Sequence, residues 1–111
     1  VYYVGLLAGT NDMDLLARSG VGRDVNRHYY SADEIAREVT RPVVQSLFAL
    51  IRLRNTHQAF EGAFTSTTNG AELTMTWQTE QESLTLSVDC ATGEATISGS
   101  GITPSQLTEL V

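Results

Sequence analysis

The side chains best suited to chemistry lie in a glycine-punctuated loop between residues 22 and 31. Arg23 and Arg27 belong to this loop, close to His28. An arginine that a loop holds in place presents several N–H donors in one plane, and this arrangement suits sugar hydroxyls and phosphate groups. A salt bridge to a nearby aspartate explains the two arginines equally well. The loop therefore predicts either a sugar or phosphate contact or a structural ion pair.

Three aspartates near the loop, Asp12, Asp14 and Asp24, can supply a pair of carboxylates for acid–base chemistry. Acidic residues at the start of a helix also need no functional reason, because they stabilise the positive end of the helix dipole. His28 can contact a sugar or transfer a proton. We favour the structural interpretation for the aspartates and a packed or solvated side chain for His28. The sequence shows no cluster of metal ligands at a known spacing and no standard phosphate-binding glycine loop.

Other reactive side chains have structural explanations. Ser31 and Glu34 form the pattern of a capping box, so Ser31 is predicted to cap a helix rather than to act as a nucleophile. Tyr29 and Tyr30 can stack on a sugar, and we expect one of them to pack in the core. Cys90 continues the inward-facing row of a predicted strand, and this position predicts a core residue.

The chain opens on an apolar run, Val1–Gly9, which has the residue types of a β-strand buried on both faces. Such a strand needs parallel neighbours, and the chain supplies none of matching character. We therefore expect Val1 to be a truncation point and the chain to be the C-terminal part of a larger protein.

Three helices are predicted after this run. The first is a short turn over residues 10–18, capped by Asn11 or Thr10 and ended by glycine. The second runs over residues 31–39 and the third over residues 41–56. The third helix has an apolar stripe wide enough to need cover from more than a small sheet.

The second half of the chain alternates apolar and polar residues, which predicts half-buried antiparallel strands. Asn69-Gly70 and Thr92-Gly93 mark hairpin turns. The tail from Gly101 is predicted to be a loop, with a last helical turn over Pro104–Leu110. The pattern predicts a meander of strands at about 63–68, 71–79, 83–90 and 94–99. The fold class is therefore α+β.

Composition narrows the function classes. The chain has 111 residues, a formal net charge of -6 and a pI near 4.7. Nucleic acids and anionic membrane surfaces attract basic patches, so this charge argues against both as partners. A single cysteine forms no internal disulfide and favours a reducing compartment, which predicts a cytoplasmic protein. No signal peptide or transmembrane segment is recognised in the sequence.

Several stretches together form a recognisable pattern. They are Val1-Tyr2-Tyr3-Val4-Gly5, Leu7-Ala8-Gly9, Asn11-Asp12-Met13, Gly22-Arg23-Asp24, Asn26-Arg27-His28-Tyr29-Tyr30-Ser31, Arg41-Pro42-Val43-Val44, Leu50, Arg54-Asn55 and Ala59-Phe60. These stretches resemble the sucrose phosphorylases of glycoside hydrolase family 13, in the α-amylase superfamily. The match is specific as far as about Phe64 and weaker across the sheet.

The resemblance implies a fold. The opening run would be the eighth strand of a (β/α)8 TIM barrel, and residues 1–60 would be the C-terminal end of that barrel, with the substrate loop and the last helices. Residues 61–111 would be a small antiparallel β domain appended after it.

The resemblance also implies an activity: a glycosyltransferase of carbohydrate metabolism that converts sucrose and phosphate to α-glucose 1-phosphate and fructose. The resemblance implies retention of configuration through a covalent glucosyl-enzyme, with an aspartate nucleophile, a glutamate acid/base and a second aspartate that stabilises the transition state. By the same resemblance these three carboxylates lie on earlier barrel strands, so no catalytic residue is expected here and the chain alone is expected to be inactive. The residue carried over from the family pattern is Arg23, which would contact the glucosyl unit.

The implied partners are sucrose, inorganic phosphate as co-substrate, glucose 1-phosphate and the remainder of the barrel, with no cofactor and no metal; a homodimer is compatible with the resemblance. Related phosphorylases act on glucosylglycerol, glucosylglycerate or sucrose 6-phosphate, and hydrolases share the scaffold. The loop does not separate these, because the acceptor side lies upstream. A non-catalytic β module for packing or carbohydrate binding is the other alternative. Trp77 shares a strand face with Leu73 and Met75, and this placement favours core packing.

Overall fold

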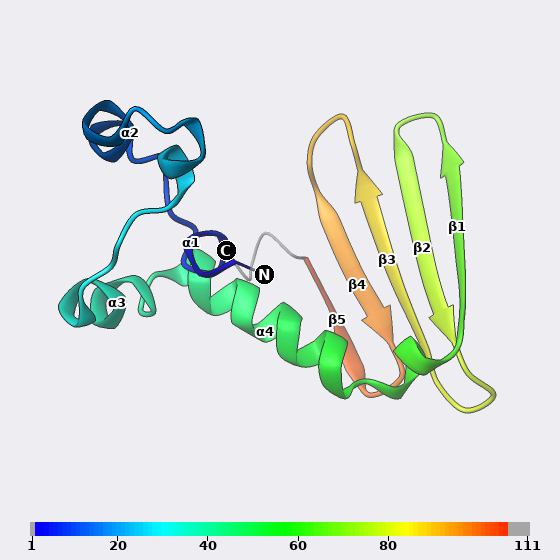
Figure 1. Ribbon diagram of the computed structural model, residues 1–111. Helices are drawn as coiled ribbons and strands as arrows, with labels where there is room; N and C mark the ends of the chain where they lie inside the picture. Colours follow the sequence, from blue (N-terminus) through cyan, green and yellow to red (C-terminus); the bar gives the residue numbers. More distant parts are fainter. Residues whose placement is uncertain (1, 107–111) are drawn as a thin grey trace. The chain divides into compact units, whose positions relative to one another are not determined.

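The computed structural model describes residues 2–106 and divides into two compact units, Val1–Phe48 and Ala49–Val111. The first unit is helical, and an antiparallel sheet forms most of the second (Figure 1). The predicted α+β class is therefore confirmed. The predicted boundary between a barrel (residues 1–60) and an appended β domain (residues 61–111) is a different division, and it stays a prediction.

The opening run is not a strand. Residues Tyr3–Leu6 form a short α-helix, α1, in which the N–H groups of Leu6 and Leu7 donate to the carbonyls of Tyr2 and Tyr3 at 2.9 and 3.0 Å. The strand prediction was wrong because a strand depends on hydrogen bonds to neighbouring strands, and a helical turn satisfies the same backbone groups locally. Val4 and Leu7, three residues apart, are both buried, as one face of a helix requires.

Four further helical segments follow, and capping side chains start the two that begin at Met13 and Ala32. These are α2 (Met13–Ser19), the 3₁₀ turn η1 (Gly22–Asn26), α3 (Ala32–Glu38) and α4 (Pro42–Thr56). Gly20 ends α2 in the left-handed conformation, with φ of 66°, as the glycine pattern predicted. The two longer helix predictions, over residues 31–39 and 41–56, are confirmed.

A second 3₁₀ turn, η2 (Gln58–Glu61), leads from α4 into the sheet. The sheet has five strands in the order β1-β2-β3-β4-β5, each antiparallel to its neighbour (Figure 1). The strands are β1 (Ala63–Asn69), β2 (Glu72–Gln78), β3 (Ser83–Asp89), β4 (Ala95–Gly99) and β5 (Ile102–Gln106). The first four agree with the predicted meander. Gly70 and Gly93 have φ of 60° and 79°, so both predicted hairpin turns use glycine where other residues would be strained.

Two predictions about the sheet were wrong. The tail after Gly101 continues as β5, because Gly101 adopts a φ of 71° and turns the chain back to pair with β4. The last predicted helical turn falls partly in this strand and otherwise outside the described residues. Cys90 is exposed, because the Asp89 side chain accepts the N–H groups of Ala91 and Thr92 and starts the turn one residue earlier than expected.

The core of the second unit lies where η2 and the end of α4 pack on the sheet. Ala59, Leu84 and Ile97 are buried there, and Leu53, Phe60, Trp77 and Ile102 pack against them. The rings of Phe60 and Trp77 have centroids 4.9 Å apart. The predicted core role of Trp77 is therefore confirmed.

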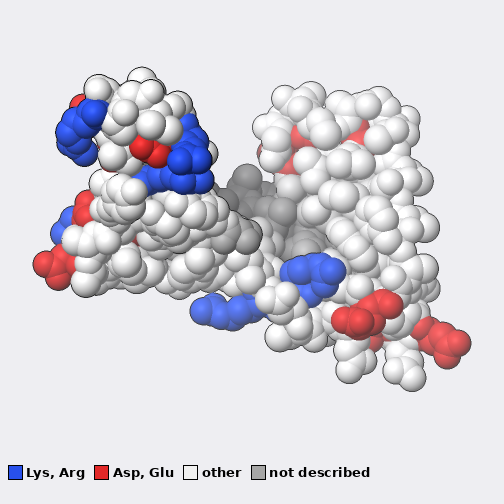
Figure 2. Space-filling model, viewed as in Figure 1, with Lys and Arg blue, Asp and Glu red and all other residues white. Residues whose placement is uncertain are grey.

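Charge is distributed unevenly along the chain. All seven basic residues are arginines, and the last of them is Arg54, before the sheet begins. On the face shown in Figure 2, the basic side chains lie over the helical segments, whereas the sheet displays acidic side chains only. Any contact with an anion through a guanidinium group must therefore come from the segments before β1.

Candidate functional site

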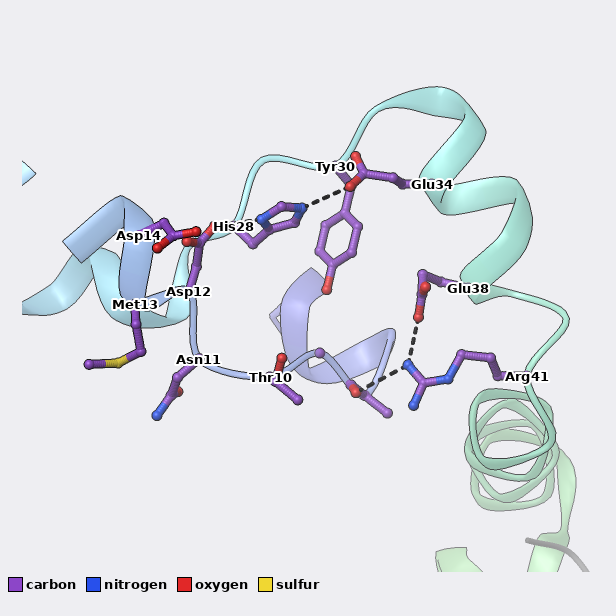
Figure 3. Close-up of a pocket in the computed structure, with 12 residues that line it drawn as sticks. Thr10, Asn11, Asp12, Met13, Asp14, His28, Tyr30, Glu34, Glu38 and Arg41 are labelled. Carbon is purple, nitrogen blue, oxygen red and sulfur yellow. Dashed lines mark hydrogen bonds and ion pairs between the residues drawn. The ribbon is translucent and has the colours of Figure 1, made fainter. Parts of the chain in front are cut away.

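A hollow of about 570 Å³ lies in the first unit (Figure 3). It is bounded by the segment from Ala8 to Asp14, by His28 and Tyr30, and by the acidic side of α3 together with Arg41. Most of the charged side chains around it belong to residues that also hold the helix ends in place. Those contacts decide which of the side chains remain free for chemistry.

Asp12 caps α2. Its Oδ1 atom accepts the backbone N–H of Leu15 at 2.7 Å, which is the bond that a capping side chain makes. The sequence predicted Asn11 or Thr10 at this position, and both predictions were wrong by one or two residues. The structural interpretation of Asp12 was correct.

The predicted capping box at α3 is present in full. The Ser31 hydroxyl accepts the N–H of Glu34 at 3.2 Å, and Oε2 of Glu34 accepts the N–H of Ser31 at 2.7 Å. Both groups of this pair are therefore engaged in starting the helix. Ser31 has the structural role that the sequence predicted.

His28 joins these two helix starts. Its Nδ1 lies 2.6 Å from Oδ2 of Asp12, and its Nε2 lies 3.2 Å from Oε1 of Glu34 (Figure 3). The hydrogen bond to Asp12, followed by the one to Glu34, raises the pKa of the imidazole. The bond to His28 lowers the pKa of Asp12, and the backbone bond to Ser31 contributes most to the lowered pKa of Glu34.

This pairing argues against Asp12 or Glu34 as the general acid of a glycosidase-type reaction. A general acid needs a pKa raised towards the working pH, and both of these carboxyl groups have lowered pKa values. Both are also occupied by hydrogen bonds to backbone N–H groups.

Arg41 forms a second link across the hollow. Its Nη1 donates to Oε2 of Glu38 at 2.6 Å and to the carbonyls of Leu7 and Ala8 at 3.4 Å (Figure 3). These carbonyls follow α1, where no further helical turn donates to them, so the Arg41 guanidinium supplies the hydrogen bonds instead. Its guanidinium is engaged in structural contacts.

Tyr30 packs beside His28 and over Gly9. The Tyr30 and His28 ring centroids are 4.6 Å apart with the rings nearly perpendicular. A Cβ atom on Gly9 would lie 2.2 Å from the Tyr30 hydroxyl, so a side chain at this position would displace the Tyr30 ring. Tyr29 is 76% exposed. Tyr30 is half-buried and lines the hollow, so the prediction that one of the two tyrosines packs in the core is not met.

Arg23 lies in η1 and is exposed, as is Arg27 just after it. Neither arginine forms an ion pair within residues 2–106, so the predicted alternative of a salt bridge to Asp12, Asp14 or Asp24 is not what the described part of the chain shows. Arg23 does not line the hollow. Its fork of donors takes no part in the contacts that hold the helix ends together and is available to a ligand.

Among the described residues, no group of three or more His, Cys, Asp or Glu side chains is arranged to hold a metal ion. In that part of the chain, no helix has both the length and the apolar character needed to cross a membrane.

No family model matches the chain. It is 49% identical over 102 residues to a sucrose phosphorylase of Agrobacterium vitis, an alignment that covers 91% of this chain and 21% of that protein. The chain is a relative of the sucrose phosphorylases. It spans about a fifth of the length of the curated relatives that it matches.

Other relatives carry different names. A glucosylglycerol phosphorylase of Marinobacter adhaerens is 46% identical over 79 residues, which are 70% of this chain and 16% of that protein. The crystal structure of a sucrose 6F-phosphate phosphorylase from Thermoanaerobacter thermosaccharolyticum superposes with a TM-score of 0.87 at 38% identity. This superposition covers 96% of the chain and 22% of the solved structure. The predicted resemblance is therefore confirmed, and it holds over the alternative of a separate β module.

Sequence reasoning missed the arrangement around His28. It treated Asp12 as an acidic residue near a helix start and Glu34 as half of a capping box, and it left His28 packed or solvated. The available signal was that both helix starts carry a carboxylate with a second oxygen to spare, and that one histidine stands in the loop between them.

Proposed function

We propose that this chain is a segment of a sucrose-phosphorylase-like retaining α-glucosyl transferase, the segment that supplies a donor-binding arginine. The enzyme would move the α-glucosyl unit of sucrose onto inorganic phosphate and release α-glucose 1-phosphate and fructose. The observation that carries the proposal is the 49% identity to a sucrose phosphorylase over 91% of the chain. The segment would come from the end of a (β/α)8 barrel of glycoside hydrolase family 13.

The state of Arg23 supports its role as the sugar contact. It stands on a 3₁₀ turn between two capped helices, exposed and without an ion-pair partner among residues 2–106. A guanidinium group presents its donors in a rigid plane, so one such side chain can hold two adjacent hydroxyls of a glucosyl unit.

The surface of α4 supports the presence of a larger structure around this segment. Its predicted apolar stripe includes Val43, Leu47, Leu50 and Ile51, which are all only half-buried in the chain as described. Val44 on the same helix is fully buried. A stripe of this width on one helix is typical of an element that is covered on more than one side.

The activity is tested on the full-length polypeptide that carries this segment. With sucrose and phosphate we expect formation of α-glucose 1-phosphate, measured by a coupled assay, and with the 111-residue chain alone we expect none. No product from the full-length polypeptide with sucrose or any related donor would refute the proposed function.

The role of Arg23 is tested by Arg23→Ala. A hydrogen bond to a charged group contributes about 1.5–3 kcal/mol, so loss of two would reduce kcat/KM by roughly 10² to 10⁴. Arg27→Ala is the matched control, since Arg27 is an exposed arginine of the same loop without an ion pair within the described residues. Equal losses in the two variants would show that the loop, and not Arg23, was being measured.

A second candidate is a related glucoside phosphorylase with another acceptor, because the similar proteins include a glucosylglycerol phosphorylase and sucrose 6F-phosphate phosphorylases. The donor panel in the assay separates these: the donor with the highest kcat/KM identifies the acceptor. The proposed enzyme uses inorganic phosphate as co-substrate and needs no cofactor or metal. We place it in the cytoplasm and propose a homodimer as its assembly.

A further inference from the structure

His28 occupies an unusual place for a loop histidine. Both of its ring nitrogens contact carboxylates, and each carboxylate belongs to the start of a different helix: Asp12 at α2 and Glu34 at α3. The two contacts are 16 and 6 residues apart in sequence. One imidazole therefore links the start of α2 to the start of α3, and the segment between these two points contains α2 and η1.

The geometry leaves the ring little freedom. Asp12 uses one oxygen for the N–H of Leu15 and the other for His28, while Glu34 uses one for the N–H of Ser31 and the other for His28. The ring cannot move without breaking a contact to a residue that also holds a helix start. Since both partners are carboxylates, the doubly protonated imidazolium is the form that donates to both.

Groups from the neighbouring elements enclose the ring. The Tyr30 ring stands edge-on at 4.6 Å, and the Tyr3 hydroxyl donates to the His28 carbonyl at 2.8 Å. Asp12 and Glu34 are the charged groups that shift the pKa of the His28 ring, and Arg18 of α2 in turn helps to lower the pKa of Asp12. No other ion pair reaches the ring within residues 2–106.

The tied segment contains the turn that carries Arg23. The backbone N–H of Asp12 donates to the carbonyl of Val25 at 2.6 Å, and η1 packs against α2. Asp12 therefore holds η1 through its backbone and His28 through its side chain. Arg23 itself makes no ion pair within the described residues, so its position depends on how η1 is held.

We propose that His28 is a positioning residue for Arg23: its ring ties the start of α2 to the start of α3 and so fixes the turn that presents the guanidinium to the sugar. This inference rests on the proposed function for its effect on activity, but the tie itself is independent of any substrate.

The deciding experiment is a double-mutant cycle in the full-length polypeptide that carries the segment. His28→Phe keeps a ring and removes both donors, and we expect kcat/KM for the glucosyl donor to fall about 10- to 100-fold, mainly through KM. In an Arg23→Ala background the same substitution should cost less than about twofold, because the residue through which it acts is gone. An equal loss in both backgrounds would overturn the proposal.

Asp12→Asn serves as a second variant that keeps the helix cap, since asparagine caps as well as aspartate. It removes the negative charge from the ring, so we expect a smaller loss in the same direction, largest at low pH, where the wild-type ring is charged. Asp14→Asn is the matched control, because Asp14 is exposed in the first turn of the same helix. We expect this substitution to change kcat/KM by less than about twofold. Equal effects of Asp12→Asn and Asp14→Asn would refute the role of the tie.

A measurement without substrate separates this inference from the proposed function. Amide hydrogen exchange in η1 should accelerate about tenfold or more in His28→Phe and remain unchanged in Asp14→Asn. If the polypeptide phosphorolyses no donor, the proposed function fails while this exchange result still stands. If exchange in η1 is unchanged in His28→Phe, the positioning role fails even in an active enzyme.

Discussion

Gly62→Ala should weaken the start of the sheet. Gly62 lies between η2 and β1, and a Cβ atom there would lie 2.0 Å from the carbonyl oxygen of Gln78 and 2.7 Å from the backbone N of Thr79. Ordinary contact begins at about 3.5 Å, so the two backbone segments would have to separate by roughly 1.5 Å. Backbone atoms cannot turn aside as a flexible side chain can.

Two effects set the size of the destabilisation. Overpacking a tight site costs about 1–3 kcal/mol, and the loss of a hydrogen bond at the end of the ladder, where Ala63 pairs with Gln78, adds about 1 kcal/mol. A destabilisation of about 2–4 kcal/mol would reduce amide protection in β1 and β2 by roughly 30- to 1,000-fold.

Hydrogen exchange measured amide by amide is the assay, because it reports on this hairpin alone. Gly22→Ala is the control: no heavy atom lies within 4 Å of the position that the alanine methyl group would take, so protection in the sheet should not change. Unchanged protection of β1 and β2 in Gly62→Ala would refute the reasoning.

Two other predictions follow from burial and charge. Leu84→Ala should cost about 2–5 kcal/mol in the free energy of unfolding of the second unit, since Leu84 is 1% exposed in its core; urea denaturation measures it, and a loss below about 1 kcal/mol would contradict the packing. The tie at His28 should stabilise the first unit most between about pH 4 and pH 6.5. The raised pKa of His28 gives stability that is fully present below about pH 6.5 and is lost as the pH rises through the folded value. The lowered pKa values of Asp12 and Glu34 give stability that is present above about pH 4 and is lost as the pH falls through their folded values. Exchange rates in η1 should therefore be slowest in this window, and His28→Phe should flatten the profile above about pH 6.5; an identical profile in the variant would exclude the histidine as its source.

Local signals predicted the local structure. The capping box at Ser31 and the glycines at positions 70 and 93 need only a few neighbouring residues, and each was placed correctly. The cap of α2 was misplaced because three capping residue types stand in succession, and sequence alone does not rank Thr10, Asn11 and Asp12 once a distant histidine also binds the last of them.

The errors share a physical cause. Whether Val1–Gly9 forms a strand depends on partners from elsewhere, and within the described chain the helical turn satisfies its backbone. The place of Cys90 and the existence of β5 were decided by turns at Asp89 and Gly101, whose geometry depends on the pairing that follows. The link through His28 spans 16 residues, beyond the reach of any local pattern.

The two borders of the sheet differ in their ability to recruit another strand. β1 is the border at one side in Figure 1, all seven of its residues are exposed, and it contains neither a charged residue nor a proline. β5 forms the opposite border and contains Pro104, which has no N–H to offer. Unpaired backbone groups on an uncharged outer strand are a template for aggregation. A lysine in place of Thr65 or Thr67 is therefore the simplest way to keep the isolated chain dispersed at the concentrations that exchange and denaturation experiments require.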